Sequence, residues 1–225
     1  MSSVQNRRSF LTQITGLAAG GAALAGVPSK AAGLQVGAPS GPVTEFKPPT
    51  WDLAWLDSFK GKYKQLYDLI WLTHKPNSIN PPKNYLDVQK ELRGLEFPDV
   101  NVAIGLVDIP INASDALWAK FKFGERWNIQ DPETGKPAIR NVYLGTGPGD
   151  PRGTVKGLQA RGVVFWMCNK SLNSLSRDLG RELGRPAGEV YAELVAGFNP
   201  GVKVVPAHTW AVGALQERGF TYERL

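Results

Sequence analysis

Short apolar runs alternate with stretches of helical pattern along the second half of the chain, and this alternation limits the fold more than any other feature. The runs VNVAIGLV at 100–107 and VVFWMC at 163–168 are typical of strands that are buried on both faces, and a shorter run follows at 202–205. The helical stretches are Ser114–Phe123, Thr154–Ala160, Leu172–Leu183, Glu189–Phe198 and Thr209–Arg218. This order predicts a single α/β domain, a mostly parallel sheet flanked by helices of the flavodoxin-like or Rossmann-like kind.

The segments before and between these elements are less regular. Tyr63–Leu72 is strongly apolar and predicts either the first strand or part of a helix, because its periodicity does not separate the two. Residues 84–94 predict a helix that ends at Gly94, and residues 131–153 make a loop of a length that is usually functional or mobile. Residues 32–50 are rich in Gly, Pro and Ser and predict a flexible linker, so the domain should span residues 51–225.

The N-terminus has the three parts of a signal peptide. Arg7 and Arg8 are followed by an uncharged run, rich in Ala and Gly, over 14–27 and then by a small-residue stretch at 29–32. The arginine pair resembles the twin-arginine consensus, which marks proteins that are exported folded. The apolar run is shorter and weaker than a bilayer-spanning helix, so no permanent membrane anchor is expected. We expect residues 1–31 to be removed and the mature protein to be periplasmic or otherwise extracytoplasmic.

Charge and composition exclude several function classes. Removal of residues 1–31 would lower the net charge from +6 to +3, because three of the 26 basic residues and no acidic residue lie there. The remaining basic residues are dispersed and do not predict a nucleic-acid partner. Cys168 is the only cysteine, which excludes an internal disulfide, and with two histidines it cannot fill a structural zinc site. No motif predicts a nucleotide or another diffusible cofactor, so neither a metal nor a cofactor is expected.

Two residues with reactive side chains follow predicted strands. Cys168 ends the run VVFWMC just before a helix, and His208 opens the helix that follows the run at 202–205. Reactive groups in parallel sheets gather at the carboxyl ends of the strands, and a helix N-terminus favours the thiolate form of a cysteine. If the two strands are neighbours, His208 can serve as the base or cationic partner of Cys168. The alternatives are a buried structural cysteine and a histidine whose ring lies in solvent.

Other residues at this edge are weaker candidates. Asp108 follows the run at 100–107, although its position before Pro110 also suits a turn or cap residue. His74 follows the first predicted strand and is more typical of a loop. A pocket at this edge is expected to draw on the following residues: Asp108, Trp118, Trp166, Asn169 and Trp210.

The last third of the chain resembles the DsrE/DsrF-like sulfur-relay superfamily. The resemblance rests on Arg161–Asn169, on Val190–Leu194, on Val204–Ala207 and on Leu215–Tyr222. Segments such as 115–120 and 131–136 are similar to an exported branch of that superfamily. The resemblance implies a small parallel-sheet fold, assembly into homo-oligomers, and persulfide transfer on the cysteine that matches Cys168. His208 stands where the resemblance leads us to expect a small residue, and export would separate the chain from cytoplasmic sulfur-relay partners.

Two hypotheses for function follow. The first is an exported sulfur (persulfide) carrier or thiol-dependent sulfur transferase that acts through Cys168, with His208 or the helix dipole stabilising the thiolate and with a sulfur donor and acceptor still to be identified. The second is a non-catalytic binding or scaffold domain in which Cys168 is structural and a tryptophan-lined pocket holds a small ligand or a partner subunit.

Overall fold

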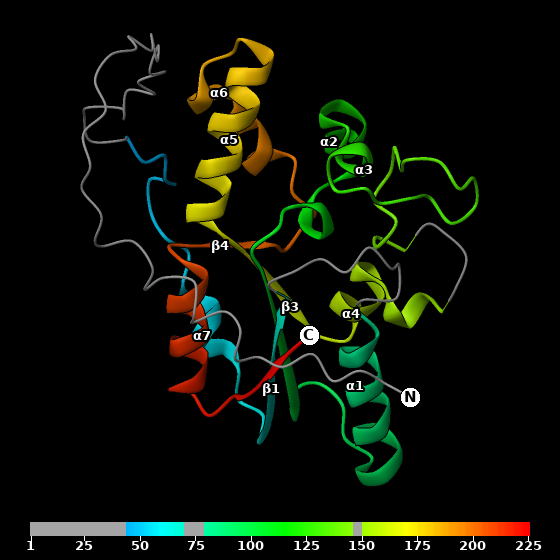
Figure 1. Cartoon of the computed structure of the whole chain (residues 1–225). Helices are drawn as coiled ribbons and strands as arrows, with labels where there is room; N and C mark the ends of the chain where they lie inside the picture. The colour runs from blue at the N-terminus through cyan, green and yellow to red at the C-terminus, as the bar shows by residue number, and fades with distance from the viewer. Residues whose placement is uncertain (1–43, 70–78, 146–149) are drawn as a thin grey trace, which may run out of the picture. The chain divides into compact units, whose positions relative to one another are not determined.

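The computed structural model describes residues 44–69, 79–145 and 150–225, and within them five strands form one sheet. The strands are β1 (Tyr63–Leu69), β2 (Val100–Leu106), β3 (Val164–Cys168), β4 (Lys203–Val205) and β5 (Thr221–Arg224). All neighbouring pairs are parallel, in the order β4-β3-β2-β1-β5 (Figure 1). The predicted single α/β domain with a parallel sheet is therefore confirmed, and Tyr63–Leu69 is a strand rather than a helix.

Helices connect the strands. They are α1 (Asn80–Arg93), α2 (Asp115–Phe121), α3 (Phe123–Arg126), α4 (Val155–Ala160), α5 (Asn169–Leu183), α6 (Ala187–Ala196) and α7 (His208–Gln216), with short 3-10 turns η1 (Ala54–Ser58), η2 (Pro110–Asn112) and η3 (Pro151–Gly153). The α1 helix ends as its sequence predicts, because Gly94 takes up a left-handed conformation with φ of 68°.

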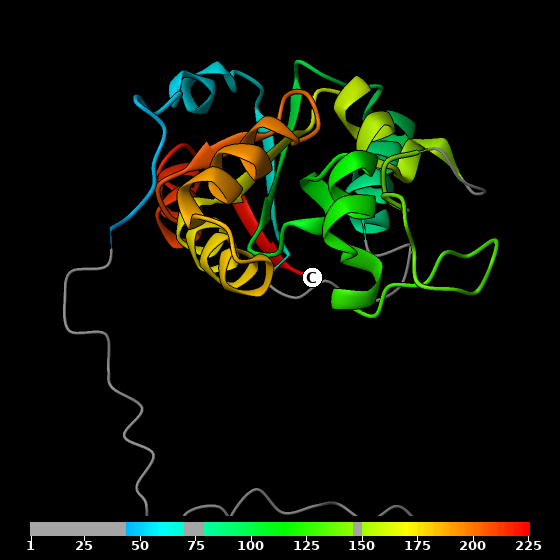
Figure 2. The same cartoon turned by 90° about the horizontal axis from the view of Figure 1, so that it is seen from above.

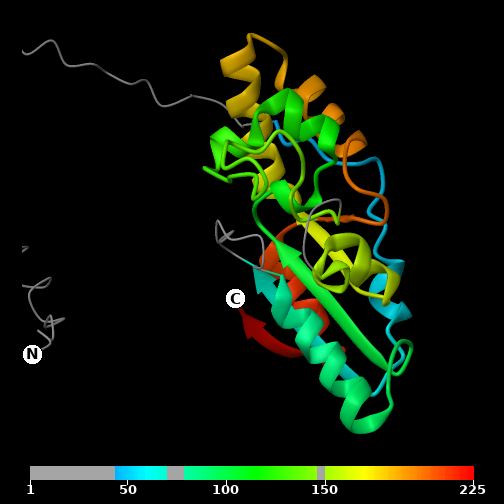
Figure 3. The ribbon, with the colours of Figure 1, turned by 90° about the vertical axis from the view of Figure 1, so that its right-hand side faces the viewer.

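The two faces of the sheet bury different layers. Because side chains alternate along a strand, Phe165 and Met167 of β3 join the larger core, to which α1, α2, α4, α5 and α6 also contribute. Leu66 and Trp166 point to the opposite face and pack with buried residues of α7 and η1. Figures 1 and 3 show α7 on one side of the strands and α1 on the other.

The order of the strands creates one topological reversal, a place where two neighbouring strands are followed by connections on opposite faces of the sheet. The connections from β1 to β2, from β2 to β3 and from β3 to β4 run through helices of the larger core, whereas the connection from β4 to β5 runs through α7 on the opposite face. The neighbouring strands β3 and β4 thus send the chain to opposite faces at their carboxyl ends. In open α/β sheets this is the position at which ligands and reactive groups gather.

The end of the predicted linker belongs to the domain. Phe46 donates its amide to Asn173 Oδ1 at 2.8 Å, and its carbonyl oxygen accepts the side-chain amides of Asn169 and Asn173. The Phe46 ring also lies 5.7 Å from the ring of Tyr191 on α6. Figure 2 shows α6 beside α5, against which it packs. The prediction of a flexible linker over 32–50 is therefore wrong for residues 44–50, because the sequence pattern did not show that buried asparagines would bind this backbone.

The described part of the loop 131–153 is held by its own polar side chains. Arg140 donates to Asp131 Oδ2 at 2.8 Å, and the buried Asn141 donates its side-chain amide to the carbonyl oxygens of Pro110, Ile111 and Ala113. The loop is thereby tied to the segment that follows β2.

Candidate functional site at the carboxyl ends of β3 and β4

Cys168 lies at the reversal between β3 and β4. It is the last residue of β3 and the N-cap residue of α5, and it is 5% exposed. Its side chain has the same strand parity as that of Trp166, which places it on the α7 face of the sheet. The thiol therefore sits where the N-terminus of α5 leaves one face and the N-terminus of α7 approaches from the other.

His208 meets Cys168 through its main chain. As the first residue of α7, His208 donates its backbone N–H to Cys168 Sγ at 3.3 Å. The first N–H groups of an α-helix have no acceptor within the helix, so the amide of His208 is available to a sulfur atom at the N-terminus of α7. The two strands are neighbours, which was the condition for an approach of His208 to Cys168, and the approach is made by the His208 amide.

The imidazole ring of His208 is turned to β1. Its Nε2 atom lies 2.7 Å from Asp68 Oδ1, and the side chains of His208 and Asp68 are only 7% and 5% exposed. The second carboxylate oxygen of Asp68 accepts the hydroxyl of Tyr222 on β5 at 2.6 Å. That hydrogen bond to Asp68 raises the pKa of the Tyr222 hydroxyl. The His208 ring is thus buried in a hydrogen-bonded chain rather than exposed to solvent.

The register of the sheet explains how these residues meet. Asp68, Gly105 and Trp166 lie in one row across β1, β2 and β3 and share the α7 face. Gly105 has no side chain, and a Cβ there would fall 2.0 Å from the Trp166 indole, so the glycine leaves the space that the indole fills. The ring of His208 lies 5.7 Å from that of Trp166. The small residue in the middle strand therefore makes room for the Trp166 indole, and the His208 ring lies near this indole while it hydrogen-bonds to Asp68.

The predicted tryptophan pocket does not form. Trp118 is buried in the larger core, where its indole N–H donates to the Pro110 carbonyl oxygen, whereas Trp166 is buried on the opposite face. Trp210 is 44% exposed and lines a separate hollow. The three indoles do not meet. Strand parity places Trp166, and α2 places Trp118, on opposite sides of the sheet, and Trp210 is exposed on α7.

Asn169 and Asp108 also have separate environments. Asn169 is buried and structural, since its amide nitrogen donates to Glu45 and to the Phe46 carbonyl and its oxygen accepts the Tyr191 hydroxyl. Asp108 lines a hollow of about 270 Å³ between the end of β2 and α5. That hollow opens on the face of the larger core, whereas Cys168 points to the α7 face.

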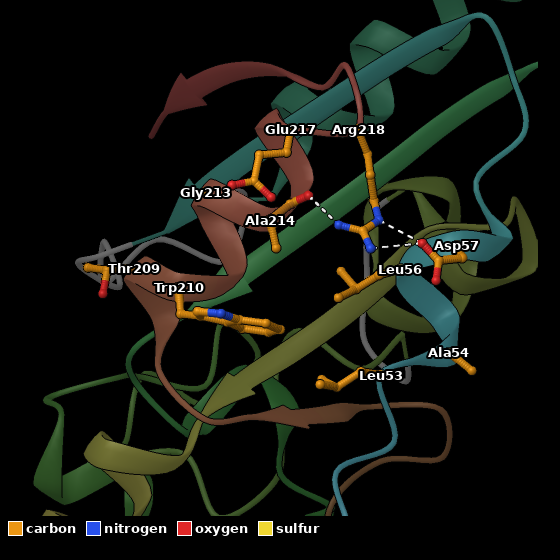
Figure 4. Close-up of a pocket in the computed structure, with 10 residues that line it drawn as sticks. All are labelled: Leu53, Ala54, Leu56, Asp57, Thr209, Trp210, Gly213, Ala214, Glu217 and Arg218. Atoms are coloured by element: carbon orange, nitrogen blue, oxygen red, sulfur yellow. Dashed lines mark hydrogen bonds and ion pairs between the residues drawn. The ribbon is translucent and has the colours of Figure 1, made fainter.

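A larger hollow of about 650 Å³ lies between η1 and α7. Figure 4 shows Trp210 along one side of it and Arg218 paired with Asp57 at the other end. Its lining residues are Leu53, Ala54, Leu56, Asp57, Thr209, Trp210, Gly213, Ala214, Glu217 and Arg218. His208 is not among the residues that line this hollow.

Sequence reasoning missed Asp68 and Tyr222. Asp68 stands in the apolar run whose type, strand or helix, could not be decided, so its place at a strand end was not recognised. Asp68 is the one charged residue within the apolar stretch 66–72, and this was the available signal, because burial of a carboxylate requires partners. His74 and most of the glycine-rich stretch 145–149 lie outside the described residues.

Within residues 44–69, 79–145 and 150–225, no three His, Cys, Asp or Glu side chains group in a way that could hold a metal ion. No helix in the same ranges is both long and apolar enough to cross a bilayer.

No family model matches the chain, and no curated protein matches it. One solved structure with a similar arrangement is a protein of unknown function from Methanobacterium thermoautotrophicum, with 14% identity and a TM-score of 0.39. The matched region covers 73% of this chain and 100% of the other chain.

Proposed function

We propose that this protein is an exported, DsrE-like sulfur carrier or thiol-dependent sulfur transferase that holds a persulfide on Cys168. The observation that carries the proposal is the position of Sγ, which lies at the reversal between β3 and β4 and accepts the His208 amide at 3.3 Å. Anions are stabilised at helix N-termini, and two helices, α5 and α7, begin at this sulfur. A thiolate or a persulfide anion is the form of cysteine that such a site favours.

The chemistry is an exchange at sulfur. The Cys168 thiolate attacks the outer sulfur of a donor persulfide R–S–SH, so that a bond forms between Sγ and that sulfur while the S–S bond of the donor breaks. The electron pair of the broken bond leaves with the donor thiolate, which takes up the proton lost by Cys168. The products are a Cys168 persulfide and the thiol R–SH, and the exchange consumes no oxidant or reductant.

Export is part of the same proposal. The twin-arginine-like pair Arg7-Arg8 and the segment that follows it support removal of residues 1–31 and delivery to the periplasm or another extracytoplasmic space. The folded state would then be reached before export, with the Cys168 site already assembled. The resemblance to the sulfur-relay superfamily supports assembly of the mature protein into a homo-oligomer.

The direct test is uptake of sulfur by the purified protein. After incubation with glutathione persulfide, wild-type protein should gain the mass of one sulfur atom, and dithiothreitol should remove it. Cys168→Ser should gain nothing. Ser174→Ala serves as the matched control, because Ser174 is an exposed hydroxyl on the same helix and its loss should leave the uptake unchanged. No mass gain in the wild type would refute the proposal.

One observation favours the second candidate, a binding or scaffold domain. Cys168 is 5% exposed, as is usual for a structural cysteine, and the hollow beside Trp210 offers room for a small ligand or a partner. Under this candidate Cys168 takes up no sulfur from the donor, and Cys168→Ser behaves as the wild type in every assay. Rapid, donor-dependent mass gain on Cys168 would exclude it.

A further inference from the structure

A chain of buried polar groups runs beside the thiol. His208 Nε2 lies 2.7 Å from Asp68 Oδ1, and the Tyr222 hydroxyl donates to Asp68 Oδ2 at 2.6 Å. Asp68 and His208 are each less than one-tenth exposed, so neither is a surface residue with incidental contacts. The His208 residue that ends this chain is also the one whose amide touches Cys168 Sγ.

The hydrogen bonds determine which ring nitrogen carries the proton. A carboxylate only accepts, and Asp68 already accepts from Tyr222, so Nε2 of His208 is the nitrogen that donates. In the neutral ring the lone pair is then on Nδ1. This Nδ1 atom is buried and has no hydrogen-bond partner among the described residues. Burial of a nitrogen whose lone pair accepts no hydrogen bond costs free energy, so such an atom in a folded protein calls for an explanation.

We infer that His208 Nδ1 is the base that takes the proton of the Cys168 thiol, with Asp68 and Tyr222 as positioning residues. The inference rests on the proposed function and extends it to residues that the sequence did not reveal. The observation behind it is that the free Nδ1 belongs to the same residue whose amide binds Sγ. A histidine oriented by a carboxylate is the kind of base that activates cysteine nucleophiles; here His208 contacts Sγ through its backbone amide, and Nδ1 makes no hydrogen bond to Sγ in the structure.

The proton movements balance. Transfer from Sγ to Nδ1 leaves a thiolate and an imidazolium, and the imidazolium is stabilised by the Asp68 carboxylate that already binds Nε2–H. When the thiolate takes the outer sulfur of the donor, the imidazolium returns the proton to the departing donor thiolate. His208 is then neutral again and Cys168 carries the persulfide.

Packing keeps the ring in this orientation. The Trp166 indole lies 5.7 Å from the His208 ring on one side and stacks on Trp55 at 6.2 Å on the other. Trp166 is fully buried and occupies the space above Gly105. The imidazole therefore stands against a fixed aromatic wall and does not depend on the carboxylate alone for its position.

The test compares the rate at which iodoacetamide alkylates Cys168 in wild-type protein and in Asp68→Asn. General-base assistance is typically worth a factor of about 10² or more, so Asp68→Asn should react at least tenfold more slowly at neutral pH. The two rates should converge above about pH 9, where hydroxide ionises a thiol without assistance. Asp57→Asn, which removes an exposed carboxylate beside α7, is the matched control and should react as the wild type does.

The pH dependence separates positioning from loss of structure. The titratable groups that hydrogen bonds join to His208 are Asp68, Tyr222 and Cys168. A disrupted fold would change the alkylation rate at every pH, whereas loss of the base changes it only where the thiol needs help. Equal rates in the wild type and Asp68→Asn at neutral pH would overturn the inference.

Two further measurements keep the test decisive. If Asp68→Asn fails to fold, as judged by circular dichroism, His208→Gln carries the same prediction, because glutamine can still donate to Asp68 but is not a base. Sulfur uptake from glutathione persulfide is measured in parallel. Sulfur uptake by the wild type together with equal alkylation rates in all variants would overturn the role of His208 and leave the proposed sulfur-carrier function intact. Unequal alkylation rates without sulfur uptake by the wild type would overturn the sulfur-carrier function alone.

Discussion

Gly105→Ala tests the packing that brings the site together. The new Cβ would lie 2.0 Å, 2.5 Å and 2.7 Å from three atoms of the Trp166 indole, which is fully buried and cannot move aside without disturbing Trp55 and His208. Overpacking of this kind costs about 1–3 kcal/mol, and three ring contacts place this case near the upper end. Replacement of a strand glycine returns about 0.5–1 kcal/mol through the unfolded chain. The net expectation is a loss of about 2 kcal/mol.

The matched control is the same substitution in α7. Gly213 lies inside that helix, and a Cβ there would meet nothing within 4 Å. Gly213→Ala should therefore stabilise the protein by about 0.5–1 kcal/mol, because alanine has the higher helix propensity. For a domain of this size each kcal/mol shifts Tm by about 2–4 °C. Thermal unfolding followed by circular dichroism should show Gly105→Ala lower by about 4–8 °C and Gly213→Ala slightly higher. A Gly105→Ala protein as stable as the wild type would refute the packing described for Trp166.

Three further predictions concern polar groups. Asn141→Ala should lower the free energy of unfolding by about 2–3 kcal/mol, measured in urea, because three buried carbonyl groups lose their donor; no change would mean that water replaces the amide. The Arg140 side chain lowers the pKa of Asp131, so this pair stabilises the fold above about pH 4 and ceases to do so as pH falls through the lowered pKa. The Tm difference between wild type and Asp131→Asn should accordingly shrink as pH falls through that lowered pKa, and a difference that persists once Asp131 is protonated would contradict the ion pair. Asp68→Asn should bring the raised pKa of Tyr222 back toward about 10, read from the phenolate absorbance against Tyr222→Phe, and an unchanged titration would contradict their hydrogen bond.

The strand ends were the part of the site that the sequence could predict. The run VVFWMC is apolar on every residue, and the run 202–205 is apolar at every residue except Lys203. Both patterns indicate buried strands, and the residue at the end of each strand is then known. Their adjacency was a condition of the hypothesis, in keeping with the tendency of consecutive strands to pair. Cys168 and His208 could therefore be expected to approach one another, as the contact of 3.3 Å shows.

The partners of the histidine could not be predicted in the same way. The meeting of Asp68 and His208 depends on strand order and register, and the packing of Trp166 near the histidine depends on the absence of a side chain at Gly105; none of these is local. Tyr222 lies on β5, which joins the sheet beside β1 only because the last connection returns along the other face. The expected pocket of Trp118, Trp166 and Trp210 failed for the same reason, since sequence proximity to strand ends does not specify the face of the sheet.

The central claim is that Cys168 carries sulfur after export, and intact-mass analysis of protein isolated without reductant from its native compartment tests it most directly. The account predicts a chain that lacks about the first 31 residues, as the signal-peptide pattern of the N-terminus predicts, and that bears the mass of one additional sulfur atom. Dithiothreitol should remove the extra mass, and Cys168→Ser isolated in the same way should lack it. The claim would be contradicted by a cleaved wild-type chain that carries no added mass on Cys168, either before or after dithiothreitol, as expected for Cys168→Ser.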